Sequence, residues 1–274
     1  MSSREEKTEG FFNKENIDGY LKELAKEYRK LVGKRMPAEI ILIGGASTLI
    51  NYGFRDMTND MDAILQAASA MEDAITRVGD RYDLPGGWLN DDFRKTESYS
   101  PKIPLYSEYY RTFSNVVTIR TVRGEHLIAM KLRAWRTYKK DQSDVVGILL
   151  EHYNMGDPIT LERVKQAVID LYDDWAVISE VARKEIENSI NRGNFEQQYK
   201  EIRAEEIENN GMLKSFLDKY PESLTEENLP NVLAQLKAKK EKPSVLKKLE
   251  HNKEIVRERE SHKKDNHKKN NLEL

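Results

Sequence analysis

The segment from Glu39 to Leu65, EIILIGGASTLINYGFRDMTNDMDAIL, decides the fold. Its β-branched start predicts a short buried strand, and the pair Gly44-Gly45 predicts a turn into one or two turns of helix. The run MDAIL predicts a second strand. One short helix therefore separates the glycine turn from Asp60 and Asp62, and we interpret the turn and the two acids as the halves of one site.

Asp60 and Asp62 stand two residues apart in the second predicted strand, so we expect their side chains on the same face of the sheet. Two neighbouring carboxylates repel each other unless a cation lies between them. Mg²⁺ prefers oxygen ligands and commonly takes one or two carboxylates together with phosphate oxygens. The pair indicates a site for Mg²⁺, or for Mn²⁺ in its place, and two solvent-exposed acids at a strand edge are the alternative.

Gly44 and Gly45 let the backbone approach a ligand closely, and the N–H groups that start the following helix favour an anion. Ser47 adds a hydroxyl that can donate a hydrogen bond. A tight turn without a ligand is the simpler interpretation of the glycines alone. In combination with the acid pair, they supply the parts that hold a nucleotide with its Mg²⁺.

The rest of the chain predicts an α+β fold, with strands confined to the first 155 residues. Between residues 95 and 115 the chain is rich in Tyr and Pro, and we expect a loop there. Apolar spacing predicts helices over 17–32, 67–84, 124–138 and 141–153, a third strand over 115–122, and only helices after residue 155.

We expect four parts along the chain: an N-terminal helix (1–35), a domain with the glycine turn and the acid pair (36–155), a helical C-terminal domain (156–236) and a polar basic tail (237–274). The tail has thirteen Lys and Arg against seven Asp and Glu. This surplus suits an anionic partner such as RNA. A solvated, disordered tail is the simpler interpretation, because acidic residues are interleaved and no aromatic residue is present.

The composition sets further bounds on a chain of 274 residues. It has no Cys, which excludes disulfides and thiolate metal sites and fits a reducing compartment. The start is charged and lacks the apolar core of a secretion signal, and no apolar run approaches the roughly 20 residues of a membrane span. We therefore expect a soluble, cytoplasmic protein that does not enter a membrane.

Several blocks of the sequence resemble a known family. They are LIGGASTL, RDMTNDMDAIL, LPGGWLND and EHLIAMKLRAWRTYKKDQSDVVGILL, all within residues 36–152. Together they look like the nucleotidyltransferases of the DNA polymerase β superfamily, and more narrowly like bacterial nucleotidyltransferases of the DUF6036 kind, related to the AbiEii toxins. The resemblance implies a minimal nucleotidyltransferase fold, a small mixed sheet flanked by helices, followed by an all-helical C-terminal region.

The resemblance also implies residue roles. The glycine turn with Ser47 corresponds to the phosphate-binding turn, and the acid pair corresponds to the metal-binding acids. Lys131 corresponds to a lysine that faces the nucleotide phosphates and completes the catalytic set, and Arg136 to a phosphate-binding arginine with Asp141 and Asp144 in support. From the residues alone, Lys131 is equally well a surface lysine beside an apolar stripe, and Asp141 a helix N-cap.

The sequence departs from the family pattern in two places. Lys140 stands where the family usually has arginine. Active members of the superfamily also carry a third carboxylate on a later central strand, and the strand over 115–122 offers Thr118 and Arg120 instead. Glu108 and Glu125 are the acids that could replace it in space.

We therefore expect a Mg²⁺-dependent nucleotidyltransferase that moves a nucleoside monophosphate from an NTP to an acceptor. The resemblance points to tRNA or another RNA as acceptor, in a toxin–antitoxin or phage-defence setting, with an antitoxin or another protein partner. The alternative is a catalytically inactive protein of the same fold that binds a nucleotide or a protein partner in a regulatory role. A helical interaction module, in which the N-terminal fold is only a scaffold, is a third interpretation.

Overall fold

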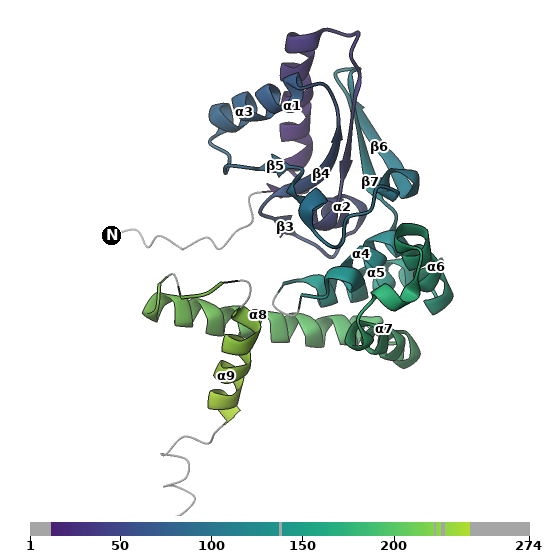
Figure 1. Ribbon diagram of the computed structural model, residues 1–274, viewed down its shortest axis with the longest axis vertical. Helices are drawn as coiled ribbons and strands as arrows, with labels where there is room; N and C mark the ends of the chain where they lie inside the picture. Colours follow the sequence, from purple (N-terminus) through teal and green to yellow (C-terminus); the bar gives the residue numbers. More distant parts are fainter. Residues whose placement is uncertain (1–11, 137–138, 222, 226–227, 242–274) are drawn as a thin grey trace, which may run out of the picture. The chain divides into compact units, whose positions relative to one another are not determined.

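The computed structural model describes residues 12–136, 139–221, 223–225 and 228–241 (Figure 1). The chain divides into two compact units, residues 1–206 and 207–274. The described part of the first unit combines a mixed sheet with helices, which confirms the predicted α+β fold.

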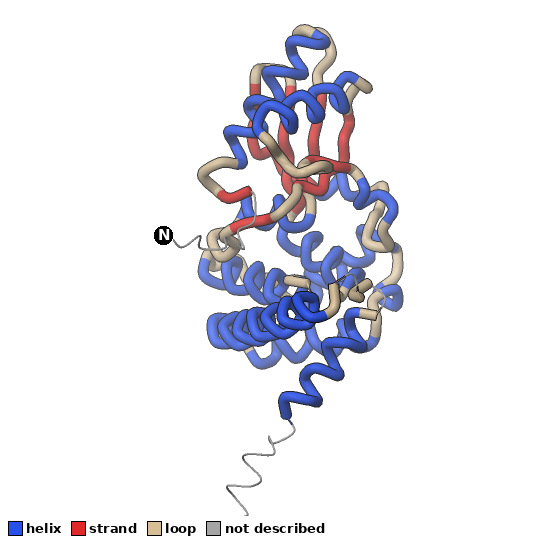
Figure 2. The backbone as a smooth tube through the Cα atoms, turned by 90° about the vertical axis from the view of Figure 1, so that its left-hand side faces the viewer, coloured by secondary structure: helices blue, strands red, loops and turns tan. Residues whose placement is uncertain are grey.

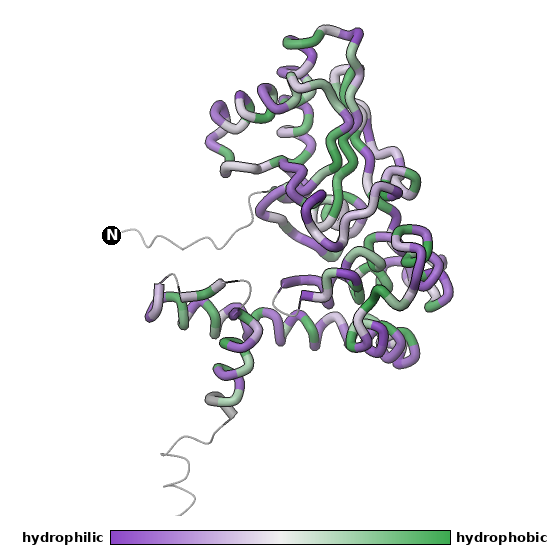
Figure 3. The backbone as a smooth tube through the Cα atoms, in the orientation of Figure 1, coloured by the Kyte–Doolittle hydropathy of each residue, from purple (hydrophilic) through white to green (hydrophobic). Residues whose placement is uncertain are grey.

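The first unit is built on a five-stranded sheet with the strand order β5-β4-β2-β7-β6 (red in Figure 2). In the middle of the sheet, β2 runs parallel to β7 and antiparallel to β4. These three strands correspond to the three predicted apolar runs, and in Figure 3 the middle of the sheet is strongly hydrophobic. The strands are β2 (Ala38–Leu42), β4 (Met61–Gln66), β5 (Leu89–Asn90), β6 (Ser107–Phe113) and β7 (Val117–Val122).

A short connection joins β2 to β4. It contains the helix α2 (Gly44–Asn51), which begins at the predicted glycine turn, and the strand β3 (Met57–Thr58). β3 pairs with β1 (Phe12–Asn13) in a separate two-stranded sheet.

Two helices, α1 (Ile17–Val32) and α3 (Ala70–Tyr82), share a hydrophobic core with the sheet (Figure 1). This core includes Ile40 and Leu42 of β2 together with Leu21 and Leu24 of α1. The buried carboxylate of Glu27 binds two arginines of α3 and ties the helices together. The predicted N-terminal helix is therefore an integral layer of this fold.

The neighbouring residues Ile41 and Ile43 belong to a second core, because successive side chains of a strand point to opposite faces. Four helices contribute to it: α4 (Gly124–Ala134), α5 (Asp141–Asn154), α6 (Leu161–Tyr172) and α7 (Glu180–Arg192). This shared core explains why the first compact unit extends to Glu206, well beyond the boundary expected near residue 155. Ile64 of β4 lies in the same core, so Asp62, two residues earlier, belongs to the strand face that meets these helices.

The helix α8 (Phe195–Lys219) begins in the first unit and continues into the second, which also contains α9 (Leu229–Glu241). Most of the predicted basic tail, from residue 242 onward, lies outside the described residues. Within the described residues, no helix has the length and apolar character needed to cross a membrane.

Three details differ from the sequence-based predictions. Residues 107–113 form the edge strand β6 rather than a loop, and β6 pairs antiparallel with β7 with an irregularity between Tyr109 and Arg111. Only the end residues of β6 are buried, so the strand lacks the apolar run that marks the central strands. Asp60 lies immediately before β4 rather than in it. The helices predicted after residue 155 are interrupted by the short 3-10 helix η3 (Trp175–Val177). Two further 3-10 helices, η1 (Asp92–Lys95) and η2 (Ile103–Tyr106), precede β6.

Candidate active site

The glycine turn and Asp62 face each other across the end of the sheet. The backbone of Ile43 is extended and donates a hydrogen bond to the carbonyl of Asp62 at 3.0 Å, which fixes the turn beside β4. Gly44 then adopts a φ of 51°, a conformation that glycine reaches without strain. A Cβ on Gly44 would stand 3.8 Å from Oδ2 of Asp62, so this carboxylate lies directly against the turn.

Gly45 is covered by a side chain that the sequence analysis did not single out. A Cβ on Gly45 would stand 2.7 Å from Nη2 of Arg55 and equally close to Oγ1 of Thr58. The absent side chain of Gly45 thus makes room for the Arg55 guanidinium. Nη1 of Arg55 donates to Asp144 at 2.7 Å, and Nε donates to the carbonyl of Met57. Because its partner is about ninety residues away, no local signal could have placed Arg55 here.

Asp60 and Asp62 occupy different environments at the start of β4. Asp60 is exposed, whereas Asp62 is partly buried. Burial and the neighbouring charge of Asp60 raise the pKa of Asp62, and Arg136 opposes this shift. A carboxylate with a raised pKa beside a second carboxylate is stabilised by a nearby cation.

Asn90 is a second residue that the sequence analysis left without a role, although it lies in the WLND block. β5 runs parallel to β4, and Asn90 pairs in register with Asp62. A side-chain hydrogen bond from Asn90 lowers the pKa of Asp62, in opposition to burial and to Asp60. Asn90 also donates to the carbonyl of Gly87 at 3.0 Å. Asn90 therefore lies beside Asp62 on the neighbouring strand.

Ser47, expected to donate to phosphate, lies inside the protein. Its side chain is fully buried, and its Oγ accepts a hydrogen bond of 3.0 Å from the backbone N–H of Val122. This bond joins α2 to the end of β7. The contact gives Ser47 a structural role, which its position after the glycine pair does not reveal.

Lys131, expected to face phosphate, is buried between two carboxylates. Its Nζ lies 3.0 Å from Asp141 and 2.7 Å from Asp144, and only 8% of the residue is exposed. Burial alone would lower the pKa of Lys131, but Asp144 and Asp141 outweigh burial and raise it. The buried lysine therefore holds the two acids in place by binding both of them.

The same two acids hold the two arginines of the site. Asp144 binds Arg55, and Asp141 binds Arg136 through Nε at 2.9 Å, Nη2 at 3.2 Å and the backbone N–H at 3.0 Å. Asp141 is the first residue of α5. Its carboxylate does not cap this helix but accepts hydrogen bonds from Arg136, in the connection between α4 and α5. A continuous chain of ion pairs thus runs from Arg55 through Asp144, Lys131 and Asp141 to Arg136.

This ion-pair chain places positive charge next to the acid pair. Arg136 and Lys139 both act on the pKa of Asp62 through their charges. Burial and the nearby charges of Arg55 and Arg203 lower the pKa of Lys140. A cluster in which cations repel one another favours an anion, and a polyphosphate is an anion of suitable charge.

The residues considered for a third carboxylate, on β6, β7 and α4, have other partners in the described part of the chain. Arg120 of β7 donates to Ser107, and Thr118 contacts Thr112 of β6. Glu108 pairs with Arg123 at 3.1 Å, and Glu125 pairs with Arg163 at 3.4 Å. Among the residues that the structure describes, no group of three or more His, Cys, Asp or Glu is placed to hold a metal ion.

Two carboxylates are nevertheless compatible with Mg²⁺ when the nucleotide supplies further oxygens. The observation that supports this fit is the Asp62 carboxylate, which is partly buried beside Asp60 and lies against the backbone of Gly44. Asp60 and Asp62 are the residues that would hold the ion. Asp141 and Asp144 are each bound by Lys131 and by one arginine, so we do not assign them as ligands of the ion.

A strand that ends in a glycine turn, a short helix and an acid pair at the start of the neighbouring strand together form the nucleotidyltransferase arrangement. A family model described as a nucleotidyltransferase of unknown function (DUF6036) matches residues 19–203. The match covers more than half of the chain, so the protein belongs to this family, as the sequence blocks indicated. No curated protein and no solved structure matches the chain.

Proposed function

We propose that the protein is a Mg²⁺-dependent nucleotidyltransferase that moves a nucleoside monophosphate from an NTP to a hydroxyl acceptor. The observation that carries this proposal is the position of the Asp62 carboxylate against the glycine turn, with the cationic side chains of Arg55 and Arg136 nearby. A nucleoside triphosphate with its metal ion is complementary to this arrangement, because the ion suits the carboxylates and the phosphates suit the arginines.

Each residue has a defined role in this proposal. Asp60 and Asp62 hold Mg²⁺, or Mn²⁺ in its place, and Asn90 orients the Asp62 carboxylate. The ion, when bound, neutralises phosphate charge and the charge of the leaving pyrophosphate. The backbone of Gly44 and Gly45 and the guanidinium of Arg55 contact the phosphates, and Arg136 adds a second positive charge.

The ion-pair chain behind the site positions its arginines. Asp144 and Asp141 fix Arg55 and Arg136, and Lys131 binds both acids in the protein interior. A guanidinium held by a buried carboxylate loses little further freedom when it binds phosphate, so its binding contribution is larger. We therefore propose a positioning role for Lys131, Asp141 and Asp144 rather than direct contact with the nucleotide.

The reaction is a substitution at the α-phosphorus of the NTP. A bond forms between the acceptor oxygen and the α-phosphorus, the bond from the α-phosphorus to the bridging oxygen breaks, and pyrophosphate leaves. The proton of the acceptor hydroxyl is released to water. The protein contributes mainly by positioning the reactants and neutralising charge.

We further propose that the acceptor is tRNA or another RNA, in a toxin–antitoxin or phage-defence setting with a neutralising protein partner. The support is the resemblance of the sequence blocks to AbiEii-type toxins and the surplus of basic residues after Lys237. This part of the proposal rests on analogy between related folds, so the first experiment identifies the molecule that accepts the nucleotide.

A transfer assay with each labelled NTP, Mg²⁺ and total RNA tests the proposal. The full chain is compared with Asp60→Ala, Asp62→Ala and the surface control Asp80→Asn, whose carboxylate lies on α3 and is exposed. Label in RNA that requires both Asp60 and Asp62, and that persists in the control, is the expected outcome. Label in protein instead of RNA would support the transferase activity and identify a protein, not RNA, as the acceptor.

The alternative is a protein of the same fold that binds a nucleotide or a protein partner without transferring anything. The position of Thr118 and Arg120 on the central strand β7, where active relatives carry a carboxylate, favours this alternative. Binding of Mg-NTP by the wild type without label transfer to RNA, protein or small molecules would support it. Absence of both binding and transfer would leave only the helical interaction module.

A further inference from the structure

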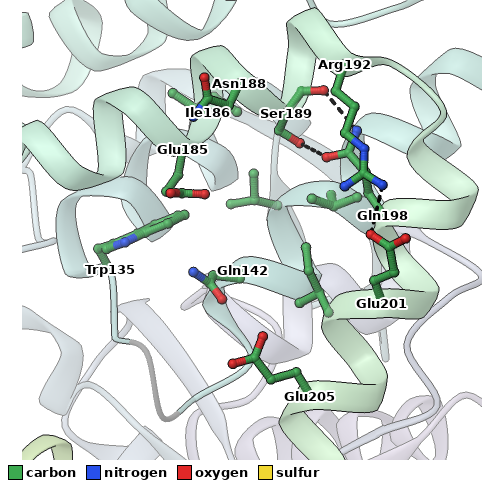
Figure 4. Close-up of a pocket in the computed structure, with 13 residues that line it drawn as sticks. Trp135, Gln142, Glu185, Ile186, Asn188, Ser189, Arg192, Gln198, Glu201 and Glu205 are labelled. Carbon is green, nitrogen blue, oxygen red and sulfur yellow. Dashed lines mark hydrogen bonds and ion pairs between the residues drawn. The ribbon is translucent and has the colours of Figure 1, made fainter. Parts of the chain in front are cut away.

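A cavity of about 250 Å³ lies between α5, α7 and the first part of α8, and it is unrelated to the acid pair (Figure 4). Val145 and Val146 of α5 and Ile186 of α7 form its buried apolar floor. The indole of Trp135, at the end of α4, forms one wall. A volume of this size corresponds to about eight water molecules at roughly 30 Å³ each, so the cavity suits a ligand of about eight non-hydrogen atoms.

The charged side chains of the lining are predominantly acidic. Glu185, Glu201 and Glu205 contribute to it, against the single base Arg192. Arg192 is already paired with Glu201 at 2.9 Å. The ion pair leaves the charge of Glu185 without a cationic partner among the described residues of the lining, and this negative charge disfavours a phosphate or a carboxylate.

Glu185 lies near the aromatic wall. In the view of Figure 4 its carboxylate and the ring of Trp135 lie at the same end of the cavity, with the amide of Gln142 below them. The side chains of Glu185 and Gln142 have no hydrogen bond or ion pair with any other residue in the part of the chain that the structure describes. In contrast, Gln198 on the opposite side is engaged with Ser189 through both amide atoms. The acceptor groups of Glu185 and Gln142, together with the buried indole N–H of Trp135, are therefore left for a ligand within the described residues.

An aromatic face beside a carboxylate and an amide oxygen, above an apolar floor, is the chemistry that recognises an organic cation. The ring attracts a cationic group, the carboxylate and the amide oxygen accept its N–H groups, and the floor accommodates its hydrocarbon stem. We propose that this cavity binds an alkylguanidinium or alkylammonium group, either as a free small molecule or as an arginine or lysine side chain of a partner.

Three probes of the same size separate charge from shape. These are n-butylguanidinium, the neutral n-butylurea and the anionic hexanoate, which have the same number of non-hydrogen atoms. The full chain, with labelled methyl groups, is titrated with each probe, and the NMR shifts of Val145, Val146 and Ile186 report occupancy of the cavity. We expect the guanidinium to bind about tenfold more tightly than the urea, and hexanoate to bind most weakly.

Three variants, one of them a control, test the assignment to residues. Glu185→Gln keeps the size of an exposed side chain, so it should preserve the fold and weaken guanidinium binding about threefold. Glu196→Gln removes an acid of α8 that lies outside the cavity and pairs with Lys200, so binding should not change. Trp135→Leu removes the aromatic face and should weaken the guanidinium more than the urea.

The possible results divide clearly. Preferential binding of the guanidinium, weakened about threefold in Glu185→Gln and unchanged in Glu196→Gln, supports the proposal. A blocked arginine, N-acetyl-arginine amide, then identifies the source: binding stronger than that of butylguanidinium indicates a protein side chain, and weaker binding indicates a free cation. Equal affinities for guanidinium and urea, no binding at millimolar concentration, or shifts outside the three floor residues would overturn it. None of these readouts depends on transferase activity.

Discussion

The protein contains two pairs of aspartates near its glycine turn, and their electrostatic environments are opposite. Asp141 and Asp144 are almost fully buried, and each binds Lys131 and one arginine. Burial alone would raise the pKa of Asp141, but Lys131 and Arg136 outweigh burial and hold it at about 2. In contrast, burial and Asp60 raise the pKa of Asp62. Within the described residues, Asp141 and Asp144 form ion pairs with protein cations, whereas Asp60 and Asp62 form none.

In the proposed function, this difference separates residues that build the site from residues that act in it. A buried carboxylate whose partners are all within the protein is a structural element, and removing one partner leaves an uncompensated charge. A carboxylate with a raised pKa beside a second acid, such as Asp62, gains stabilisation when a cationic ligand binds. The family pattern by itself treats all four acids as site residues, whereas their contacts assign them to two functions.

The largest expected effect is the loss of transfer when the pair of Asp60 and Asp62 is broken. Asp62→Asn should lower the transfer rate by at least about a thousandfold, which is about 4 kcal/mol of transition-state stabilisation, because the residue would hold the metal ion. The free energy of unfolding should stay the same or rise, since repulsion from Asp60 is relieved. Transfer rates and urea unfolding of the variant and of Asp80→Asn measure both quantities, and a large loss of stability would place Asp62 with the structural acids.

Breaking the pair of Asp141 and Asp144 should have its main effect on stability. Asp144→Ala leaves Lys131 and Arg55 in the interior with one partner fewer, and we expect the free energy of unfolding to fall by about 3–5 kcal/mol. Chemical denaturation measures this loss, with the exposed Asp73→Ala as the matched control. A loss of less than about 1 kcal/mol would contradict the structural role.

A third change tests the link between the two pairs through Arg55. In Gly45→Ala the new methyl group would overlap Nη2 of Arg55 and Oγ1 of Thr58, and displacing them should cost about 1–3 kcal/mol of stability. Nucleotide affinity should fall as well, because Arg55 is moved from the turn. Gly86→Ala is the control, since a Cβ there meets no atom within 4 Å. Unchanged nucleotide binding in Gly45→Ala would exclude Arg55 from the phosphate site.

Acidification should weaken the pair of Asp141 and Asp144 in a defined pH range. The folded-state pKa of Asp141 is depressed to about 2 from an ordinary value of 3.8, so its stabilisation is fully present above about pH 4 and is lost as the pH falls toward 2. The loss amounts to about 2 kcal/mol. Urea unfolding at a series of pH values measures it, and Asp141→Asn should flatten the curve between pH 4 and 2. An identical curve for this variant would assign the acid dependence to other groups.

The smallest predicted effect concerns Ser47. Ser47→Ala removes the acceptor of the Val122 N–H and should lower the free energy of unfolding by about 1 kcal/mol. The nucleotide Kd should change by less than about twofold, because the hydroxyl is buried. Isothermal titration with Mg-NTP distinguishes this outcome from the phosphate-binding role that the sequence suggested, for which the Kd would rise about tenfold.

Much of the fold could be predicted because its signals are local. The apolar runs around Ile40, Ile64 and Ile119 mark the three central strands, and Gly44-Gly45 marks the turn. The edge strand β6 escaped prediction, because most of its residues face solvent and its pattern resembles that of a loop. The compact unit that ends at Glu206 also escaped, because it depends on a core that α4 shares with α6 and α7.

The sequence by itself determined the order of strand, glycine turn, short helix and acid pair, since β-branched runs and glycines act over a few residues. Only the tertiary structure decided which charged groups meet. Arg55 reaches Asp144 across 89 positions, and Lys131 turns inward to two carboxylates instead of outward to a ligand. Such choices follow from packing, because the energy of a buried charge depends on every neighbour that replaces water and not on its place along the chain.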